Sequence, residues 1–360
     1  MSAFKPRDAA VVRRLTLDLS LAGAKRKVTE KIARSLSGVE QRGECLFVGS
    51  DEGPSFERLQ RIGKKTYGRR DSFGLGDFFK DLPGKDQDEA DVESIAVHKD
   101  WLWVVTSHAL TRPKLRDDEE GSSDVEAFAR PEFHPRRFVL GRIPLIDADG
   151  ETPTPVARDG ERRAWCVPAA ASGSALTEVL AQDDHLRQAL TVPAKENGLD
   201  IEGIAVRDQR VVLGLRGPVL RGEAVLLDLD LSPDKAGMGP SGGWPGVSYR
   251  KRFLDLNGLG VRDLCRRKKD LFILAGPTMP LPAPYRVYAL PGFFKAGGGP
   301  EVLTPQYLCD VPAEEGRNPE GLSPYGGEAD EFIMVMDGER SENGLRARAC
   351  VIRVPEPDHE

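Results

Sequence analysis

The chain has 360 residues, with 51 lysines and arginines against 57 aspartates and glutamates, which gives a formal net charge of −6. Because the two kinds of charge are interspersed, the sequence carries no electrostatic footprint for nucleic acid or an anionic membrane, and we expect neither as a partner. The N-terminal residues are polar, and the sequence contains neither a signal peptide nor a membrane-spanning stretch, so we expect a cytoplasmic protein.

The first predicted element is a strand near the N-terminus, where Leu15, Leu17, Leu19 and Leu21 alternate with other residues. This period of two is typical of a strand that buries one face. The strand has no hairpin before it. We therefore predict that it is the outermost strand of the last repeat and closes a ring by pairing with the C-terminal segment.

A short motif recurs along the rest of the chain, with its best copies at residues 91–96, 200–205 and 318–323 and weaker copies at 37–40 and 260–264. Each copy is followed by polar turn residues and an apolar run, at residues 45–48, 101–105, 211–215, 271–275 and 332–336. Further apolar strands follow four of these hairpins, at residues 137–143, 224–229, 285–290 and 349–354. A repeated strand–turn–strand unit indicates an all-β protein with radial repetition.

The spacing of the motif predicts a single β-propeller. Glu40 and Glu93 are 53 residues apart, Glu202 and Arg262 are 60 apart, and Arg262 and Glu320 are 58 apart. Periods of this length are typical of four-stranded propeller blades. We therefore predict one domain that covers residues 1–360.

The gap between Glu93 and Glu202 is 109 residues, which is about two periods. It could hold a degenerate sixth blade or insertions into one blade. Residues 111–136 are charged and poor in strand formers, and residues 174–190 have the apolar periodicity of a helix with Ser174 as its N-cap. We therefore favour five blades with insertions at residues 111–136 and 146–192.

The motif residues are predicted to meet at one mouth of the central channel. In an antiparallel hairpin the start of the first strand lies beside the end of the second. One face of the ring should therefore collect the motif residues and the residues that end each apolar run, namely Glu40, Asp51, Glu93, His108, Glu202, Arg216, Arg262, Asp263, Glu320 and Asp337.

Several carboxylates at one mouth repel one another, and their negative charges need to be compensated. Four of them about 8 Å apart would repel by roughly 2 kcal/mol per pair at an effective dielectric constant of 20. Protonation, pairing with Arg216 and Arg262, or a divalent cation would relieve this repulsion. Oxygen ligands suit Ca²⁺, or else Mg²⁺, and the predicted metal ligands are Glu40, Glu93, Glu202, Glu320 and Asn318.

The other site residues are assigned by chemistry. His108 is the histidine predicted on the rim and is the candidate general acid or base. Arg216 and Arg262 offer planar guanidinium groups that could hold an anion, or could instead pair with the motif glutamates. Substrate contacts are predicted for Lys195, Asn197, Asp200 and Asp337.

The Glu-Gly repeats and the stretches 195–203, 214–218 and 317–321 resemble a bacterial propeller family of unknown function. More distantly, the chain is similar to phytase-like esterase propellers, in which a comparable Glu-Gly motif recurs around a ring. It is also similar to gluconolactonase and paraoxonase propellers, which hold calcium or a similar divalent ion in the central channel. The near resemblance implies the fold alone, and the distant ones imply metal-dependent hydrolysis.

Two functional hypotheses follow. The first is a divalent-metal-dependent hydrolase of a small anionic ester, with phosphoesters ahead of lactones, acting at the channel mouth. The second is a non-catalytic propeller that binds a small ligand or a protein partner, in which each motif glutamate has a structural role between blades. An open, metal-binding mouth favours the first hypothesis, and a mouth filled by ion pairs favours the second.

Overall fold

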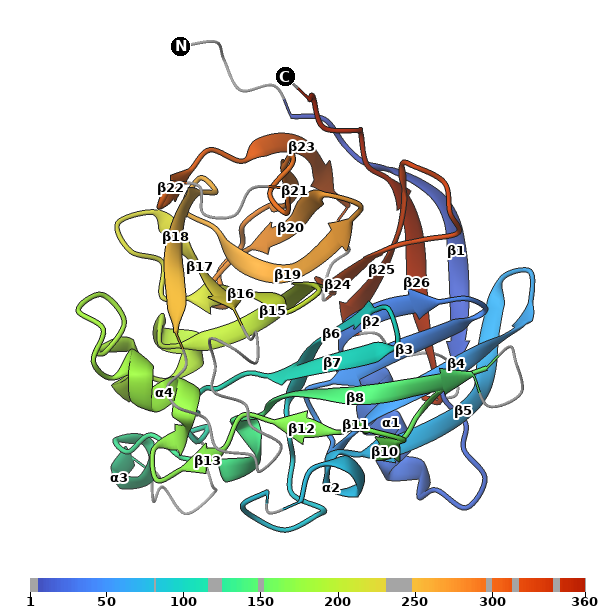
Figure 1. Cartoon of the computed structure of the whole chain (residues 1–360), viewed down its shortest axis with the longest axis horizontal. Coiled ribbons are helices and arrows are strands. Elements are labelled where there is room, and N and C mark those ends of the chain that lie inside the picture. Colours follow the sequence, from blue (N-terminus) through green and yellow to red (C-terminus); the bar gives the residue numbers. More distant parts are fainter. Residues whose placement is uncertain are drawn as a thin grey trace.

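The computed structural model describes residues 6–80, 82–115, 125–147, 152–230, 248–295, 300–312, 317–338 and 344–359. The predicted all-β propeller class is confirmed, since antiparallel sheets are arranged radially around a central axis with the first strand of each sheet innermost (Figure 1). None of the described helices has both the length and the apolar character needed to cross a membrane.

Within the described residues, the strands are grouped in chain order into five units, of which the first and last are joined into one eight-stranded sheet by the parallel pairing of β1 with β5. Unit 1 consists of β2 (Leu36–Arg42), β3 (Cys45–Ser50), β4 (Ser55–Gly63) and β5 (Thr66–Gly74). Unit 2 consists of β6 (Val92–His98), β7 (Trp101–Thr106), β8 (Leu140–Asp147) and β12 (Trp165–Cys166), and β9 (Pro153–Pro155) also pairs with β8. Unit 3 consists of β15 (Asp200–Arg207), β16 (Arg210–Gly217), β17 (Glu223–Asp230), β18 (Tyr249–Asp255) and β22 (Val302–Leu303).

The last two units complete the ring. Unit 4 consists of β19 (Gly260–Arg267), β20 (Asp270–Gly276), β21 (Tyr285–Leu290) and β23 (Gln306–Val311). Unit 5 consists of β24 (Asn318–Pro324), β25 (Glu331–Asp337), β26 (Arg346–Arg353) and β1 (Ala10–Asp18). Because β1 pairs antiparallel with β26, from Ala10 opposite Arg353 to Asp18 opposite Arg346, the predicted closure by the two ends of the chain is confirmed (Figure 1).

The hydrophobic core lies between neighbouring units. The inner strands contact one another in the order β2, β6, β15, β19 and β24, and β24 contacts β2 again. Each of the five interfaces between units holds its own cluster of buried apolar side chains. Leu17 of β1 and Val48 of β3, for example, are fully buried in the cluster between units 5 and 1. Burial of both faces of each sheet explains why alternation along the strands is only partial.

All five inner strands are irregular at the same position. The pairing register shifts just before Val39, Ser94, Gly203, Asp263 and Gly321, as expected for a β-bulge. A bulge bends the strand and re-aims the side chain of the extra residue. The residues at the bulges are Ser37, Glu93, Glu202, Arg262 and Glu320.

The glycine of the Glu-Gly motif has a packing role. A Cβ atom on Gly203 would lie 2.8 Å from the backbone nitrogen of Leu264, and one on Gly321 would lie 2.7 Å from the carbonyl oxygen of Ser37. Both neighbours belong to the next inner strand, so the strands approach too closely there for a side chain. The motif therefore combines an aimed residue with a close contact between units.

The remaining elements connect the units. The helices are α1 (Arg26–Arg34), α2 (Leu75–Phe78), α3 (Val125–Phe128) and α4 (Ala175–Leu180), and 3-10 turns occur at Pro135–Arg137, Ala189–Thr191 and Ala194–Glu196. Short hairpins form from β10 (Arg158–Asp159) with β11 (Arg162–Arg163) and from β13 (Ala169–Ala170) with β14 (Gly173–Ser174). Parts of the predicted insertions, residues 116–124 and 148–151, lie outside the described residues.

The helix predicted for residues 174–190 begins as expected but is much shorter. It starts after Ser174, whose backbone N–H donates to the Thr177 hydroxyl at 3.0 Å, and it ends at Leu180. The Asp183 carboxylate then accepts hydrogen bonds from the backbone N–H groups of His185 and Leu186. Side-chain to backbone bonding of this kind competes with the helical pattern, which explains the early end.

Candidate functional site

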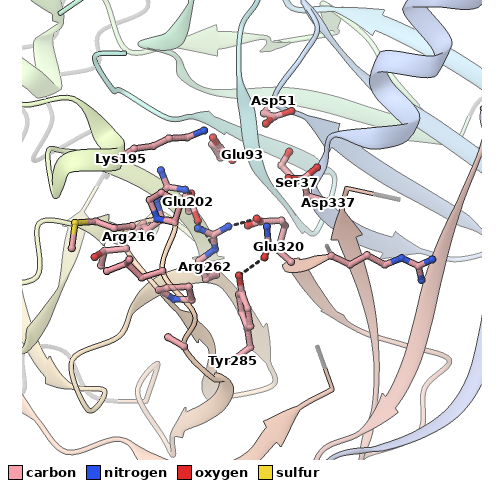
Figure 2. A pocket seen from close by; sticks show the side chains of 18 of the residues that line it. Ser37, Asp51, Glu93, Lys195, Glu202, Arg216, Arg262, Tyr285, Glu320 and Asp337 are labelled. Atoms are coloured by element: carbon pink, nitrogen blue, oxygen red, sulfur yellow. Dashed lines mark hydrogen bonds and ion pairs between the residues drawn. The ribbon is translucent and has the colours of Figure 1, made fainter. Parts of the chain in front are cut away.

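A cavity of about 610 Å³ lies at the mouth of the ring, where the inner strands begin. The bulge residues of all five inner strands line it, and so do residues that end the second strands. The structure brings together nine residues that the sequence placed in the site, namely Asp51, Glu93, Lys195, Glu202, Arg216, Arg262, Asn318, Glu320 and Asp337 (Figure 2).

Two arginines link the carboxylates of the cavity. Arg216 forms ion pairs with Asp200 and, at 2.6 Å, with Glu202. Arg262 lies 3.1 Å from Glu202 and also pairs with Glu320, so it lies between the two glutamates (Figure 2). Glu202 therefore forms ion pairs with both guanidinium groups. This arrangement agrees with the ion-pair alternative for the two arginines.

Glu93 differs from its neighbours, because within the described chain it has neither an ion pair nor a hydrogen bond of its side chain. Asp91 next to it pairs with Arg137 at 2.6 Å, and Arg137 also pairs with the more exposed Glu89. Carboxylate oxygens of Glu93, Asp200 and Glu202 all lie within 4.8 Å of one another. Two oxygens on one Ca²⁺ at the usual 2.3–2.6 Å are separated by at most about 5 Å, so the three carboxylates fit one ion.

The buried part of the site is short of positive charge. Asp91, Glu93, Asp200, Glu202 and Glu320 are five carboxylates that face three guanidinium groups, those of Arg137, Arg216 and Arg262. If all are ionised, two negative charges are left over. Two bound protons or one divalent cation would neutralise them.

Burial and the neighbouring negative charges raise the pKa values of the carboxyl groups in this cluster. Burial, with Asp91, Glu202 and other nearby carboxylates, raises the pKa of Glu93 well above its usual range. Burial raises the pKa of Glu320 to about 8, although Arg262 acts in the opposite direction. Burial likewise raises the pKa of Asp200 to about 6, against the effect of Arg216. The cluster therefore holds protons near neutral pH when no cation is bound.

Glu40 was predicted as a metal ligand in the mouth, and the structure places it elsewhere. The bulge in β2 comes before Val39, so Ser37 and not Glu40 corresponds to Glu93 and Glu202. The carboxylate of Glu40 instead accepts a hydrogen bond from the Ser323 hydroxyl at 2.8 Å. The position in unit 1 that corresponds to the motif glutamate is therefore three residues before Glu40. Ser37-Gly38 takes the place of the Glu-Gly pair there.

Two further predicted residues do not reach the cavity. His108 is 1% exposed, its Nδ1 contacts the Thr106 carbonyl oxygen at 2.8 Å, and burial lowers the pKa of its ring to about 4. A positive φ of 53° turns the chain at His108, away from the line of β7. Asn197 also has a positive φ, of 67°, and its amide exchanges hydrogen bonds with the backbone of Val219. Asp200, by contrast, lies beside the cavity through its pair with Arg216.

Asp263 was predicted on the rim and lies below it. Its carboxylate accepts hydrogen bonds from the Ser94 hydroxyl at 2.6 Å, from the backbone N–H of Leu322 at 2.7 Å and from that of Leu264 at 2.8 Å. The Ser94 oxygen in turn accepts from the N–H of Ile204. These groups come from units 2, 3, 4 and 5, and Asp263 and Ser94 are at most 2% exposed. They fill the axis and form the floor of the cavity.

Some residues of the site were missed by the sequence analysis. Tyr285 lines the cavity and donates a hydrogen bond to Asn318 Oδ1 at 2.9 Å. Residues 279–283 were also missed. They continue the proline-rich loop 277–283 beyond Pro277 and Thr278, which the hairpin argument places at this rim, and the loop forms an apolar wall with Met279 and Leu281 exposed. Ser37 and Arg137 complete the set. The position of Ser37 before a glycine at the weak motif copy was the available signal for it.

The raised carboxyl pKa values predict that stability falls as the pH rises. A carboxyl group that binds its proton more tightly in the folded state loses stabilisation between its unfolded pKa of about 4 and its folded pKa. For Asp51, burial and then Asp91 and Asp337 raise the pKa to about 8. One such group contributes a slope of at most roughly 1.4 kcal/mol per pH unit. Asp51→Asn should therefore reduce the pH dependence of the free energy of unfolding between pH 5 and 8. Urea unfolding in the presence of EDTA measures this.

The control for this pH series is Asp184→Asn, since the Asp184 side chain is 84% exposed. It should keep the slope of the unsubstituted chain. An Asp51→Asn protein with an unchanged slope would show that Asp51 is ionised throughout this pH range.

The comparisons with known proteins give one family and several similar solved structures. The profile of a family described as "Protein of unknown function (DUF3616)" matches residues 35–351. No curated protein matches the chain in sequence. Among solved structures, the chain is similar in fold to the glutaminyl cyclase of Myxococcus xanthus, with 11% identity, a TM-score of 0.43 and coverage of 98% of this chain and 100% of that one. It is also similar to the PQQ-bound aldose sugar dehydrogenase of Streptomyces coelicolor, with 15% identity, a TM-score of 0.38 and coverage of 96% and 98%.

Proposed function

The chain belongs to the DUF3616 family of proteins of unknown function, and we propose that its channel mouth is a divalent-metal-dependent hydrolase site for a small anionic ester. The observation that carries this proposal is the set of three clustered carboxylates in a site where, with all groups ionised, the carboxylates outnumber the guanidinium groups by two. A hard divalent cation with oxygen ligands matches both the donors and the missing charge.

Glu93, Asp200 and Glu202 are the proposed ligands, with Ca²⁺ ahead of Mg²⁺. Glu93 offers a carboxylate without a competing partner, and the other two come from β15, whose bulge directs Glu202 to the axis. Calcium is favoured because it accepts irregular sets of oxygen ligands, whereas Mg²⁺ requires nearly octahedral geometry. Glu320 and Asn318 lie across the cavity and are second candidates.

The basic residues would hold the anionic part of the substrate. When a cation shares the carboxylate of Glu202, the ion pairs of Glu202 with Arg216 and Arg262 weaken, and their N–H groups become available to an anion. Lys195, exposed at the rim, adds a further positive charge near Glu93 (Figure 2). Phosphoesters are favoured over lactones because guanidinium groups bind phosphate oxygens in pairs.

When bound, the cation would supply a polarised ester oxygen and an activated water. The residues of the chain position the substrate: the arginines and Lys195 orient the anion, and the apolar loop 277–283 shields the mouth from bulk water on one side. His108 has no part in this proposal, because it lies outside the cavity.

A binding protein without catalytic activity is the second candidate. It is favoured by the arginine partners that four of the five carboxylates already have. In that case the ion pairs fix the units to one another, and the cavity takes up a small ligand at its rim.

Calcium titration by calorimetry of chelator-treated protein tests the proposal. We expect one site per chain and an increase of the melting temperature by roughly 3–4 °C at a calcium concentration of 100 times the Kd. Glu93→Gln should weaken binding at least about tenfold, because it removes a ligand oxygen and its charge.

The matched control is Glu178→Gln, at an exposed position of α4. It should bind calcium like the unsubstituted chain. Calcium-dependent hydrolysis of 4-nitrophenyl phosphate that is lost in Glu93→Gln and kept in Glu178→Gln would support catalysis. If neither calcium nor magnesium binds, the hydrolase proposal is wrong and the binding function remains.

A further inference from the structure

We propose that a second cavity, on the outer edge of unit 2, binds a small organic anion with an apolar body. This cavity of about 720 Å³ lies between the end of α2 and the strands β10 to β14. Its size is within the range of roughly 300–1,000 Å³ that is usual for small-molecule sites. It shares no lining residue with the channel mouth.

Four aromatic side chains line this outer cavity. Phe78, Phe79 and Phe138 are buried and Trp165 is partly exposed, so the cavity presents rings on several sides. Aromatic side chains of this kind gain several interactions with an apolar ligand at little cost in conformational entropy.

Two glycines fix the rings at the back of the cavity. A Cβ on Gly141 would lie 2.5 Å from Cζ of Phe79, and one on Gly173 would lie 2.7 Å from Cε1 of Phe138. Each ring therefore rests directly on backbone. The rings are held in place before a ligand binds, which lowers the cost of ordering the site.

The rim of the outer cavity is basic. Of the charged residues that line it, Lys80, Arg158 and Arg163 are cationic and only Asp77 is anionic. Asp77 is engaged, since its Oδ2 accepts the backbone N–H of Gly74 at 3.1 Å. Arg163 and Lys80 have no ion-pair partner in the described part of the chain. An apolar pocket under uncompensated arginines matches a carboxylate or sulfonate that carries an aryl or alkyl group.

The insertion between β8 and β15 forms one side of the cavity, and residues 77–80, 82–83 and 138–139 form the other. The hairpin of β10 and β11 supplies both arginines, and β12 adds Trp165 and Cys166 to the edge of β8 (Figure 1). Closure of the ring requires none of these short strands. The inserted residues therefore help to enclose an aromatic cavity in addition to the propeller itself.

The test uses 8-anilinonaphthalene-1-sulfonate, an aromatic anion whose fluorescence rises on binding, with the full chain. We expect binding to one site that 4-phenylbutyrate displaces and its neutral amide does not. Arg158→Gln/Arg163→Gln should raise the Kd at least about fivefold, because it removes both guanidinium groups. Arg187→Gln/Arg250→Gln, at two exposed positions outside the cavity, is the matched control and should change the Kd less than about twofold.

Cys166 locates the bound probe. It lines the outer cavity and is partly exposed, whereas Cys45, Cys265, Cys309 and Cys350 are buried. Mass spectrometry should therefore show slower alkylation of Cys166 when the probe is bound. The proposal is overturned if the probe does not bind, if the double substitution has no effect on its Kd, or if Cys166 is alkylated at the same rate with and without it.

Discussion

Arg216→Gln is expected to lower the free energy of unfolding by about 3–5 kcal/mol, because it leaves two buried carboxylates without their common partner. Asp200 is 1% exposed and Glu202 3% exposed, and both pair with Arg216. Burial acts to lower the pKa of Arg216, but the two carboxylates outweigh it and raise this pKa. The guanidinium group is therefore charged at all accessible pH values, and its removal leaves the cluster with one positive charge fewer.

Urea unfolding at pH 8 and pH 5 measures this effect. The loss should be smaller at pH 5, because burial raises the pKa of Asp200 to about 6, and protonation of Asp200 relieves the repulsion that the missing arginine no longer offsets. Arg187→Gln is the control, since Arg187 pairs with Asp184 at 3.0 Å on the surface with its own side chain 56% exposed. It should cost less than about 1 kcal/mol. A loss of that small size in Arg216→Gln would mean that water already compensates the carboxylates.

Asp263→Ala should cost about 3–5 kcal/mol, since it removes the acceptor of three buried hydrogen bonds. The Ser94 hydroxyl and the N–H groups of Leu264 and Leu322 would lose their partner, and each unsatisfied buried donor costs roughly 1–3 kcal/mol. Burial raises the pKa of Asp263 well above its usual range, so loss of an unfavourable charge returns part of this energy. We therefore place the expected value below the full sum.

Asp263→Asn separates hydrogen bonding from charge. The amide oxygen can still accept one or two of the three bonds, while its NH₂ group faces a donor, so an intermediate loss is expected. This variant also gives a measurement if the alanine protein does not fold. Asp184→Ala, at an exposed position, should stay within about 0.5 kcal/mol. Equal stability of the Asp263→Ala protein and the unsubstituted chain would show that the floor of the cavity is held by apolar packing alone.

The sequence was sufficient for the ring and for most of the mouth, for one physical reason. Antiparallel hairpins place the start of one strand beside the end of the next, so the positions of Glu93, Glu202 and Glu320 in the repeat imply the positions of Arg216 and Asp337. The same logic failed in unit 1, where Glu40 was taken as the motif acid. At most copies of the motif, neighbouring inner strands approach too closely for a side chain, so the copy needs a glycine. Gly38 meets this need in unit 1, although the residue before it is a serine and not a glutamate.

Other features depend on contacts that no local pattern encodes. The left-handed conformation of His108 removes it from the mouth by a rotation at a single residue. The pairing of Arg137 with Asp91 joins two segments more than 40 residues apart in the sequence, and one of them lies after the insertion. Asp263 occupies the position of a motif glycine, and only the three-dimensional ring shows that its carboxylate reaches across the axis.

The pairing of β1 with β26 has a consequence for synthesis on the ribosome. Residues 10–18 are made before the other strands of the ring, but their antiparallel partner at residues 346–353 follows more than 300 residues later. Until then the strand pairing of β1 within the described residues is its short parallel contact with β5 at Thr16 and Leu17. Units 2, 3 and 4 contain no such distant strand and can form as the chain emerges, whereas unit 5 must wait. The nascent chain therefore carries an open strand edge for most of its elongation, and this period is when binding by chaperones would matter most.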